Sequence, residues 1–137
     1  MTEEAKTLTI TLTGRPPVRV IVGDWPVIAD AKEREWEGEH EFQAFRRSRA
    51  AIRVRRHADG RVIVHGSYVY DANSTTERSH QFRDGVVLEA DGDIVQAIQE
   101  VARELDDRVQ SVGGDRFGVD MLELGRGCIA DLPAEDM

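Results

Sequence analysis

The sequence predicts an α+β fold: an N-terminal antiparallel β-sheet, meander-like and of about four to six strands, with two C-terminal helices packed on one face. Apolar and polar residues alternate in the first part of the chain with the period of a half-buried strand. An Asp59-Gly60 pair between two β-rich runs is a strong hairpin signal. Beyond residue 93 the apolar spacing becomes that of a helix. We expect a single domain over residues 1–137, with the sheet at about 7–89 and the helices at about 93–110 and 120–132.

Length and composition are those of a globular chain. Its 137 residues, 40% hydrophobic and 32% charged, are enough for one core and too few for a second domain. No run approaches the roughly 18 apolar residues of a membrane span, and the acidic residues 1–4 differ from a secretory signal. Cys128 is the only cysteine, which excludes an intrachain disulfide and a cysteine-based metal site. We expect a cytoplasmic protein without membrane contacts.

The first part of the chain predicts a pair of strands followed by a break. Residues 7–13 alternate strictly, which predicts the first strand. Residues 14–17 carry a turn signal, after which the chain returns as a second strand. Pro26 then ends the ladder, because proline cannot donate a hydrogen bond to a central strand. We expect residues 27–36 to be extended again, with Gly38 as the turn before a long extended stretch.

The hairpin near residue 59 allows two registers. With a two-residue loop, Val54 faces His65, and polar and apolar residues mix on both faces. With a three-residue loop, Gly60 is left-handed and Val54 pairs with Val64. A slip by one residue moves every side chain to the other face of the sheet. We therefore predict the three-residue loop, which separates the two kinds of residue.

This register sorts the hairpin into two faces. The apolar face holds Ala50, Ile52, Val54, Val62, Val64, Tyr68 and Tyr70. The other face is a candidate basic surface of Arg49, Arg53, Arg55, His57, Arg61 and His65. Ile63 is the one apolar exception on the basic side. Arginine is suited to bidentate contacts with phosphate oxygens, so a nucleic-acid-binding surface is one interpretation.

The C-terminal half predicts a polar loop, a short strand and two helices. Residues 71–85 indicate the loop and residues 86–89 the last strand. Asp93 caps the first helix, with a glutamine three residues on as in a capping box. Asp120 caps the second helix, although two glycines within it disfavour a helix by up to about 1 kcal/mol each. Cys128 falls on the apolar side of this helix as a buried thiol.

Charge is unevenly distributed along the chain. The net charge of −8 argues against a preference of the whole protein for nucleic acid or anionic membrane. Residues 46–65 reverse this sign, with seven arginines against one acid. Only two of the 18 basic residues are lysines, a bias typical of proteins from GC-rich bacterial genomes.

An acidic ladder offers a second interpretation of the basic surface. Glutamates occupy every second position just before the arginine-rich strand: Glu33, Glu35, Glu37, Glu39 and Glu41. If that stretch pairs with the arginine strand, opposite charges face each other and contribute roughly 0.2–1 kcal/mol per pair. The glutamates then determine the strand pairing, and they neutralise most of the positive charge that could attract a ligand. We favour this interpretation, which depends on whether residues 26–45 form one strand or a hairpin, a point that the sequence leaves open.

Catalytic and cofactor-binding motifs are missing from the sequence. His57 and His65 lie four pairing levels apart, roughly 13 Å, which is too far to share a metal ion. No short-spaced cluster of histidine and acidic residues predicts a metal site, and neither glycine-rich phosphate-loop motif occurs. We expect no catalytic residue, no metal and no cofactor.

These observations favour a non-enzymatic binding or regulatory module that acts on a protein partner or associates with itself. Nucleic-acid binding through the candidate basic surface is the alternative. An enzyme with a site assembled from scattered residues such as His57, His65 and Arg55 is a third hypothesis.

Overall fold

The computed structural model describes residues 6–39, 44–72, 79–112 and 119–133. The elements, in chain order, are β1 (Thr7–Leu12), β2 (Arg15–Ile21), the short 3₁₀ helix η1 (Val22–Asp24), β3 (Val27–Glu39), β4 (Ala44–Arg56), β5 (Val62–Ala72), β6 (His80–Leu88), α1 (Ile94–Ser111) and α2 (Met121–Ala130). Strands β3-β4-β5-β6 form a four-stranded antiparallel meander, and β1 and β2 form a separate antiparallel pair. The predicted α+β fold, with strands first and helices last, is confirmed.

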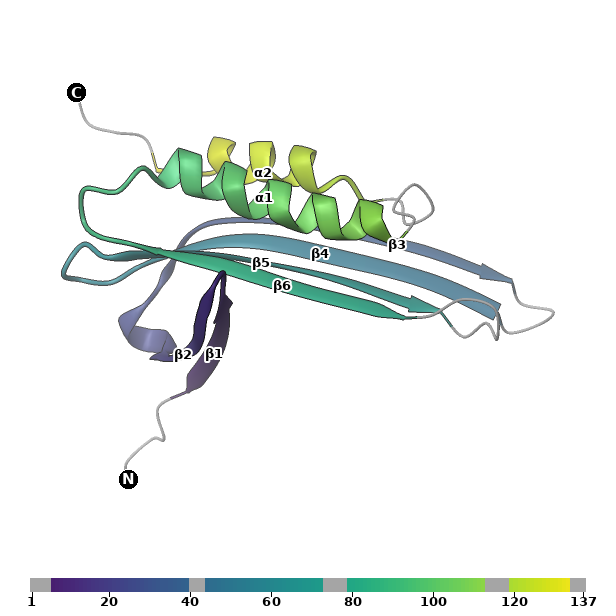
Figure 1. The fold of residues 1–137 in the computed structure, drawn as a ribbon, viewed down its shortest axis with the longest axis horizontal. Helices are drawn as coiled ribbons and strands as arrows, with labels where there is room; N and C mark the ends of the chain where they lie inside the picture. Colours follow the sequence, from purple (N-terminus) through teal and green to yellow (C-terminus); the bar gives the residue numbers. More distant parts are fainter. Residues whose placement is uncertain (1–5, 40–43, 73–78, 113–118, 134–137) are drawn as a thin grey trace.

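The molecule has three layers, with the four-stranded sheet in the middle (Figure 1). Both helices cover one face of the sheet, α1 over β5 and β6 and α2 over β3 and β4. The β1–β2 hairpin lies against the opposite face, where β1 contacts β6 and β5. The sequence predicted the helices on one face, whereas the separation of β1–β2 from the main sheet is a finding of the structure.

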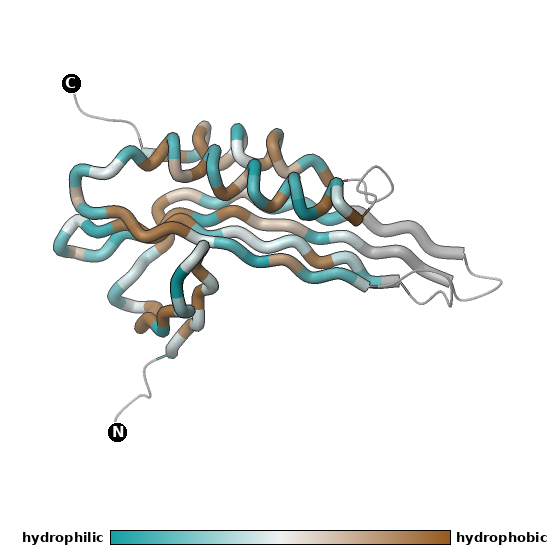
Figure 2. Tube along the Cα trace, in the orientation of Figure 1, coloured by the Kyte–Doolittle hydropathy of each residue, from teal (hydrophilic) through white to brown (hydrophobic). Residues whose placement is uncertain are grey.

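The main core lies between the sheet and the helices. Hydrophobic and hydrophilic residues alternate in bands along both helices, as expected for helices with one buried face (Figure 2). Gly66 lets α1 approach β5, because a Cβ there would lie 2.7 Å from Leu105 Cδ1. Gly125 has the same role between the helices, where a Cβ would lie 2.8 Å from Ala102 Cβ. Gly125, one of the two glycines that disfavour a helix in the sequence, is therefore required for the packing of α2 against α1.

A second, smaller core lies under the β1–β2 hairpin. Its buried members are Ile10, Leu12, Val20, Trp25 and Ile63. Gly85 of β6 permits the contact, because a Cβ there would lie 2.6 Å from the backbone oxygen of Thr11. Ile63, the apolar exception on the basic side of the sheet, is thus a core residue of this second layer.

The β4–β5 hairpin has the predicted register. Val54 pairs with Val64, and Arg53 pairs with His65. Gly60 has a φ of +96°, the left-handed conformation that the three-residue loop demands. All seven residues of the predicted apolar face are buried: Ala50, Ile52, Val54, Val62, Val64, Tyr68 and Tyr70.

Both predicted helix caps are present. The Asp93 carboxylate accepts from the backbone N–H of Gln96 at 3.1 Å. The Asp120 carboxylate accepts from the backbone N–H groups of Leu122 and Glu123, at 3.0 and 3.2 Å. Each aspartate satisfies N–H groups that a helix start leaves without an intrahelical partner.

The predicted turn at residues 14–17 is wrong in its extent. Strand β2 begins at Arg15 and includes Pro16 and Pro17, and Arg15 pairs with Leu12. Proline is tolerated there because, within the described residues, β2 pairs on one side only and its other edge needs no ladder hydrogen bond.

Two other predicted boundaries are also wrong, because strands continue through polar sequence. Gly38 lies inside β3, opposite Phe45, and is not the turn. The predicted loop at residues 71–85 is in large part strand, since β5 runs to Ala72 and β6 starts at His80. Residues 40–43 and 73–78, which connect these strands, lie outside the described residues.

Candidate functional site

The structure divides the six residues of the candidate basic surface into three groups. All belong to the face of the sheet that the helices do not cover, or to the turn at its end. The β1–β2 hairpin covers one part of this face and leaves the rest open (Figure 1). The groups are Arg55 with His65, His57 with Arg61, and Arg49 with Arg53.

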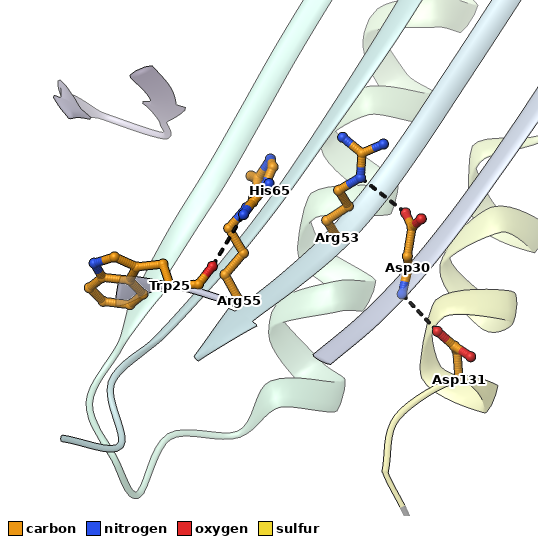
Figure 3. Close-up of polar contacts among 6 residues, drawn as sticks. All are labelled: Trp25, Asp30, Arg53, Arg55, His65 and Asp131. Carbon is orange, nitrogen blue, oxygen red and sulfur yellow. Dashed lines mark hydrogen bonds and ion pairs between the residues drawn. The ribbon is translucent and has the colours of Figure 1, made fainter. Parts of the chain in front are cut away.

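Arg55 and His65 lie in the covered part. Arg55 is 7% exposed, and its Nε donates to His65 Nε2 at 3.0 Å while its Nη1 donates to the Trp25 carbonyl at 3.1 Å (Figure 3). Burial, followed by the positive charges of Arg55 and Arg53, lowers the pKa of His65 to about 4. The imidazole is therefore neutral at pH 7 and acts as a hydrogen-bond acceptor. This pair joins β4 to β5 and to the chain just before β3.

His57 and Arg61 belong to the turn. The His57 and Trp25 ring centroids are 5.0 Å apart, and the Arg61 guanidinium carbon lies 5.4 Å from the Trp25 ring. Asp59 Oδ2 accepts from Arg61 Nε at 2.8 Å. Hydrogen bonding from the backbone N–H of Arg61 is the largest cause of a lowered Asp59 pKa. Both basic residues are thus engaged in contacts that hold the turn.

Arg53 and Arg49 lie in the open part. Arg53 Nε bonds Asp30 Oδ1 at 3.2 Å, and the Asp30 backbone N–H donates to Asp131 Oδ2 at 2.9 Å, just beyond α2 (Figure 3). Arg49 is exposed, and its cross-strand neighbour in β3 is Arg34, which is also exposed. Only these two of the six predicted residues remain on the open face.

Three further cations share this open face, and the sequence reasoning missed them: Lys32, Arg83 and Arg34, which is already described opposite Arg49. Lys32 stands opposite Ala51, and Arg83 of β6 stands opposite Ser67. Both side chains are exposed. We call the set the open basic face: Lys32, Arg34, Arg49, Arg53 and Arg83. For Lys32 and Arg34 the signal in the sequence was the alternation of cations with glutamates along β3, which places the two kinds on opposite faces.

The prediction that glutamates neutralise the candidate basic surface is wrong, since Glu37 is the one described glutamate of β3 opposite an arginine, and that arginine is Arg46 on the helix-covered side. Glu33 pairs with Ala50 and Glu35 with Ser48, positions that alternate onto the helix-covered side of β4. Glu37 and Glu39 follow the same alternation, and Glu41 lies outside the described residues. The described acids at open-face positions are Asp30, bonded to Arg53, and Asp71 on β5. The cause is the parity of the β3–β4 register, which sets Arg34 rather than a glutamate opposite Arg49.

The other side of the molecule has the opposite charge. The described residues from 89 onward carry ten acids and three arginines, and we call this set the acidic helix layer. Its acids are Glu89, Asp91, Asp93, Glu100, Glu104, Asp106, Asp107, Asp120, Glu123 and Asp131, and its bases are Arg103, Arg108 and Arg126. The charge segregation seen along the sequence is therefore a separation between two faces in space.

Groups for metal binding or nucleophilic chemistry are scarce in the described part of the chain. It contains no group of three or more His, Cys, Asp or Glu residues placed to hold a metal ion. Cys128 is fully buried in the main core, as predicted, and burial raises the pKa of its thiol to about 11. Neither described helix is long and apolar enough to span a bilayer.

Comparison of the chain with protein-family models, with curated proteins and with solved structures returns no match. The function is therefore inferred from the chain's own geometry and charge.

Proposed function

We propose that this protein is a non-enzymatic binding module that uses its open basic face to hold a polyanionic partner. The observation that carries the proposal is the Arg34–Arg49 pair. The two arginines are direct cross-strand neighbours, both exposed, and the glutamates of β3 alternate onto the other side of the sheet.

A like-charged pair of this kind works against the stability of the sheet. Charges of one sign directly opposite each other on an antiparallel ladder are destabilising. An acid at either position would stabilise the sheet alone, as Asp30 does beside Arg53. A bound anion removes the repulsion and gains two guanidinium contacts, which supports a role in binding.

The chemistry of the face also suits an anion with many oxygens. Four of its five cations are arginines. The guanidinium is a planar fork of donors that matches phosphate, sulfate and carboxylate groups. The acidic helix layer carries the net negative charge of the chain, so the basic character of the open face coexists with an overall charge of −8.

Retention on immobilised heparin, a generic polyanion, tests the proposal. We expect the wild-type protein to be retained at about 50 mM salt despite its net charge, since such contacts strengthen as salt falls. The double variant Arg34→Ala/Arg49→Ala should elute at clearly lower salt.

The matched control is Arg103→Ala/Arg126→Ala, which removes the same charge from the exposed surface of the acidic helix layer. It should elute with the wild type. No retention of the wild type, or equal shifts for the two double variants, would overturn the proposal.

A further inference from the structure

Resting on the proposed function, we infer that the polyanion is a nucleic acid duplex, held through its phosphate backbone without sequence preference. The inference combines the spread of the cations, the residues between them and the position of the aromatic side chains.

The cations are spread over the face rather than gathered at one point. They extend from β3 to β6, three strand spacings or roughly 14 Å across. Along β4, Arg49 and Arg53 are four residues apart, roughly 13 Å. A single phosphate group needs donors that converge, whereas a duplex offers one charge per about 1.7 Å of its axis. A dispersed array of arginines matches the second kind of ligand.

The residues directly between the cations are small or polar, with the exception of Val69. Ala51, Ser67, Val69 and Gln81 occupy the open-face positions of β4, β5 and β6 that lie among the five cations, whereas Trp36 and Phe45 occupy open-face positions beyond Arg34 and Arg49. Protein–protein interfaces concentrate aromatic and other large apolar residues at their centre. Interfaces with nucleic acid are more polar and strongly positive. The composition of the area between the cations favours nucleic acid over an acidic protein surface.

The aromatic side chains of β5 and β6 favour a duplex over a single strand. Tyr68, Tyr70 and Phe82 occupy register positions on the helix-covered side, where they pack in the main core. A single-strand site needs aromatic rings exposed among its cations, on which bases stack. Trp36 of β3 and Phe45 of β4 are the exceptions, since their register positions belong to the open face, next along from Arg34 and Arg49. The Trp36→Ala variant therefore tests this point directly.

Fluorescence anisotropy with labelled oligonucleotides provides the experiment. The probes are a duplex of about 20 base pairs in two unrelated sequences and the corresponding single strands, and polyglutamate serves as competitor. We expect the duplexes to bind alike and more tightly than the single strands, without displacement by polyglutamate. In a salt series, Arg34→Ala/Arg49→Ala should reduce the slope of log K against log salt by about 2, one unit per lost phosphate contact.

Arg103→Ala/Arg126→Ala should leave the slope unchanged, and so should Trp36→Ala. Tighter binding of single strands that is lost in Trp36→Ala would overturn the duplex assignment. Displacement by polyglutamate would show an acidic polypeptide partner instead. Retention on heparin without duplex binding at about 50 mM salt would refute this inference and leave the proposed function standing, whereas loss of heparin retention would overturn both.

Discussion

Arg55 and Arg49 lie on the same strand and the same face of the sheet, six residues apart, in two different environments. Arg55 is covered by the β1–β2 hairpin and bonds two neutral acceptors, the His65 imidazole and the Trp25 carbonyl. Arg49 is exposed and faces Arg34. The two differ through what packs over them, since each is an arginine at an alternate position of one ladder. Covering an arginine gives it a structural role, and leaving it open makes it available to a ligand.

Arg53 lies between these extremes, both in position and in environment. It is partly exposed and bonded to one carboxylate, that of Asp30. From Arg55 through Arg53 to Arg49, the exposure of the arginine side chain to solvent therefore rises along β4. The number of hydrogen-bond acceptors that it contacts within the described part of the protein falls in the same order. The covered part contributes to stability and the open part to binding, which separate measurements can distinguish.

Removing Arg55 should have the largest effect on stability. Arg55→Met leaves the Trp25 carbonyl and His65 Nε2 without their donor in a buried position, at a cost of about 2–4 kcal/mol in the free energy of unfolding. Arg49→Met should change that free energy by no more than about 0.5 kcal/mol. Urea unfolding followed by circular dichroism compares the two, and equal losses would contradict the division of the face.

Acid should weaken the covered part through His65. Its pKa is about 4 in the folded protein against about 6.5 when unfolded, so between these values the unfolded chain binds the extra proton. The part of the free energy of unfolding that depends on a neutral His65 is fully present above about pH 6.5. It is lost as the pH falls to about 4, and the total loss is up to about 3 kcal/mol. His65→Gln keeps an acceptor for Arg55 and should flatten the difference in stability between pH 7 and pH 4.5. An unchanged pH dependence in the variant would contradict this assignment.

A methyl group at Gly85 should displace the hairpin that covers Arg55. The added Cβ meets the Thr11 backbone oxygen at 2.6 Å, so the hairpin must shift, at a cost of about 1–3 kcal/mol. Gly23→Ala is the control, because no heavy atom lies within 4 Å of its added Cβ. Thermal unfolding should show a lower midpoint for Gly85→Ala alone.

Relieving the repulsion in the open part should have the smallest effect and the opposite sign. Arg34→Ala should raise the unfolding free energy by a few tenths of a kcal/mol at low salt, and the gain should vanish near 1 M salt. Lys32→Ala, whose cross-strand neighbour is Ala51, should give no such gain. Denaturant unfolding at two salt concentrations measures the difference, and destabilisation in Arg34→Ala would show a structural role for that side chain.

The local sequence pattern was sufficient to predict the register of the β4–β5 hairpin and the first residues of both helices. Val54 and Val64 pair because one face must be buried, and Gly60 permits the loop that this pairing needs. Asp93 and Asp120 cap helices through bonds that reach only three residues. Each of these features is decided within a short segment, and such segments are what a sequence pattern reports.

The position of the β1–β2 hairpin on the main sheet could not be predicted from the local sequence pattern. Its contact with β6 joins residues about 70 positions apart, and nothing in residues 7–21 specifies the surface they cover. Ile63 was the one available signal, because an apolar residue in a polar row implies a second layer. Without that layer, Arg55 and Arg49 look equivalent in the sequence.

The prediction that the glutamates neutralise the candidate basic surface was wrong for a different reason. Glu33 and Arg34 are neighbours, so a register shift of one residue exchanges which of them faces the arginine strand. The shift depends on the length of the connection from β3 to β4, and the sequence suggested a turn at Gly38 where the strand in fact continues. Because the sequence left open whether residues 26–45 form one strand or a hairpin, the parity of this register, and with it the charge of the face, could not be predicted.

The acidic helix layer and the open basic face lie on opposite sides of one small molecule, which gives it a large electric dipole. A polyanion exerts a torque on such a molecule before any contact forms, so the protein approaches with its arginines leading. Orientation of this kind acts on the rate of encounter more than on the lifetime of the complex. Added salt should therefore slow association strongly, and each bound protein presents a negative surface to the next one that arrives.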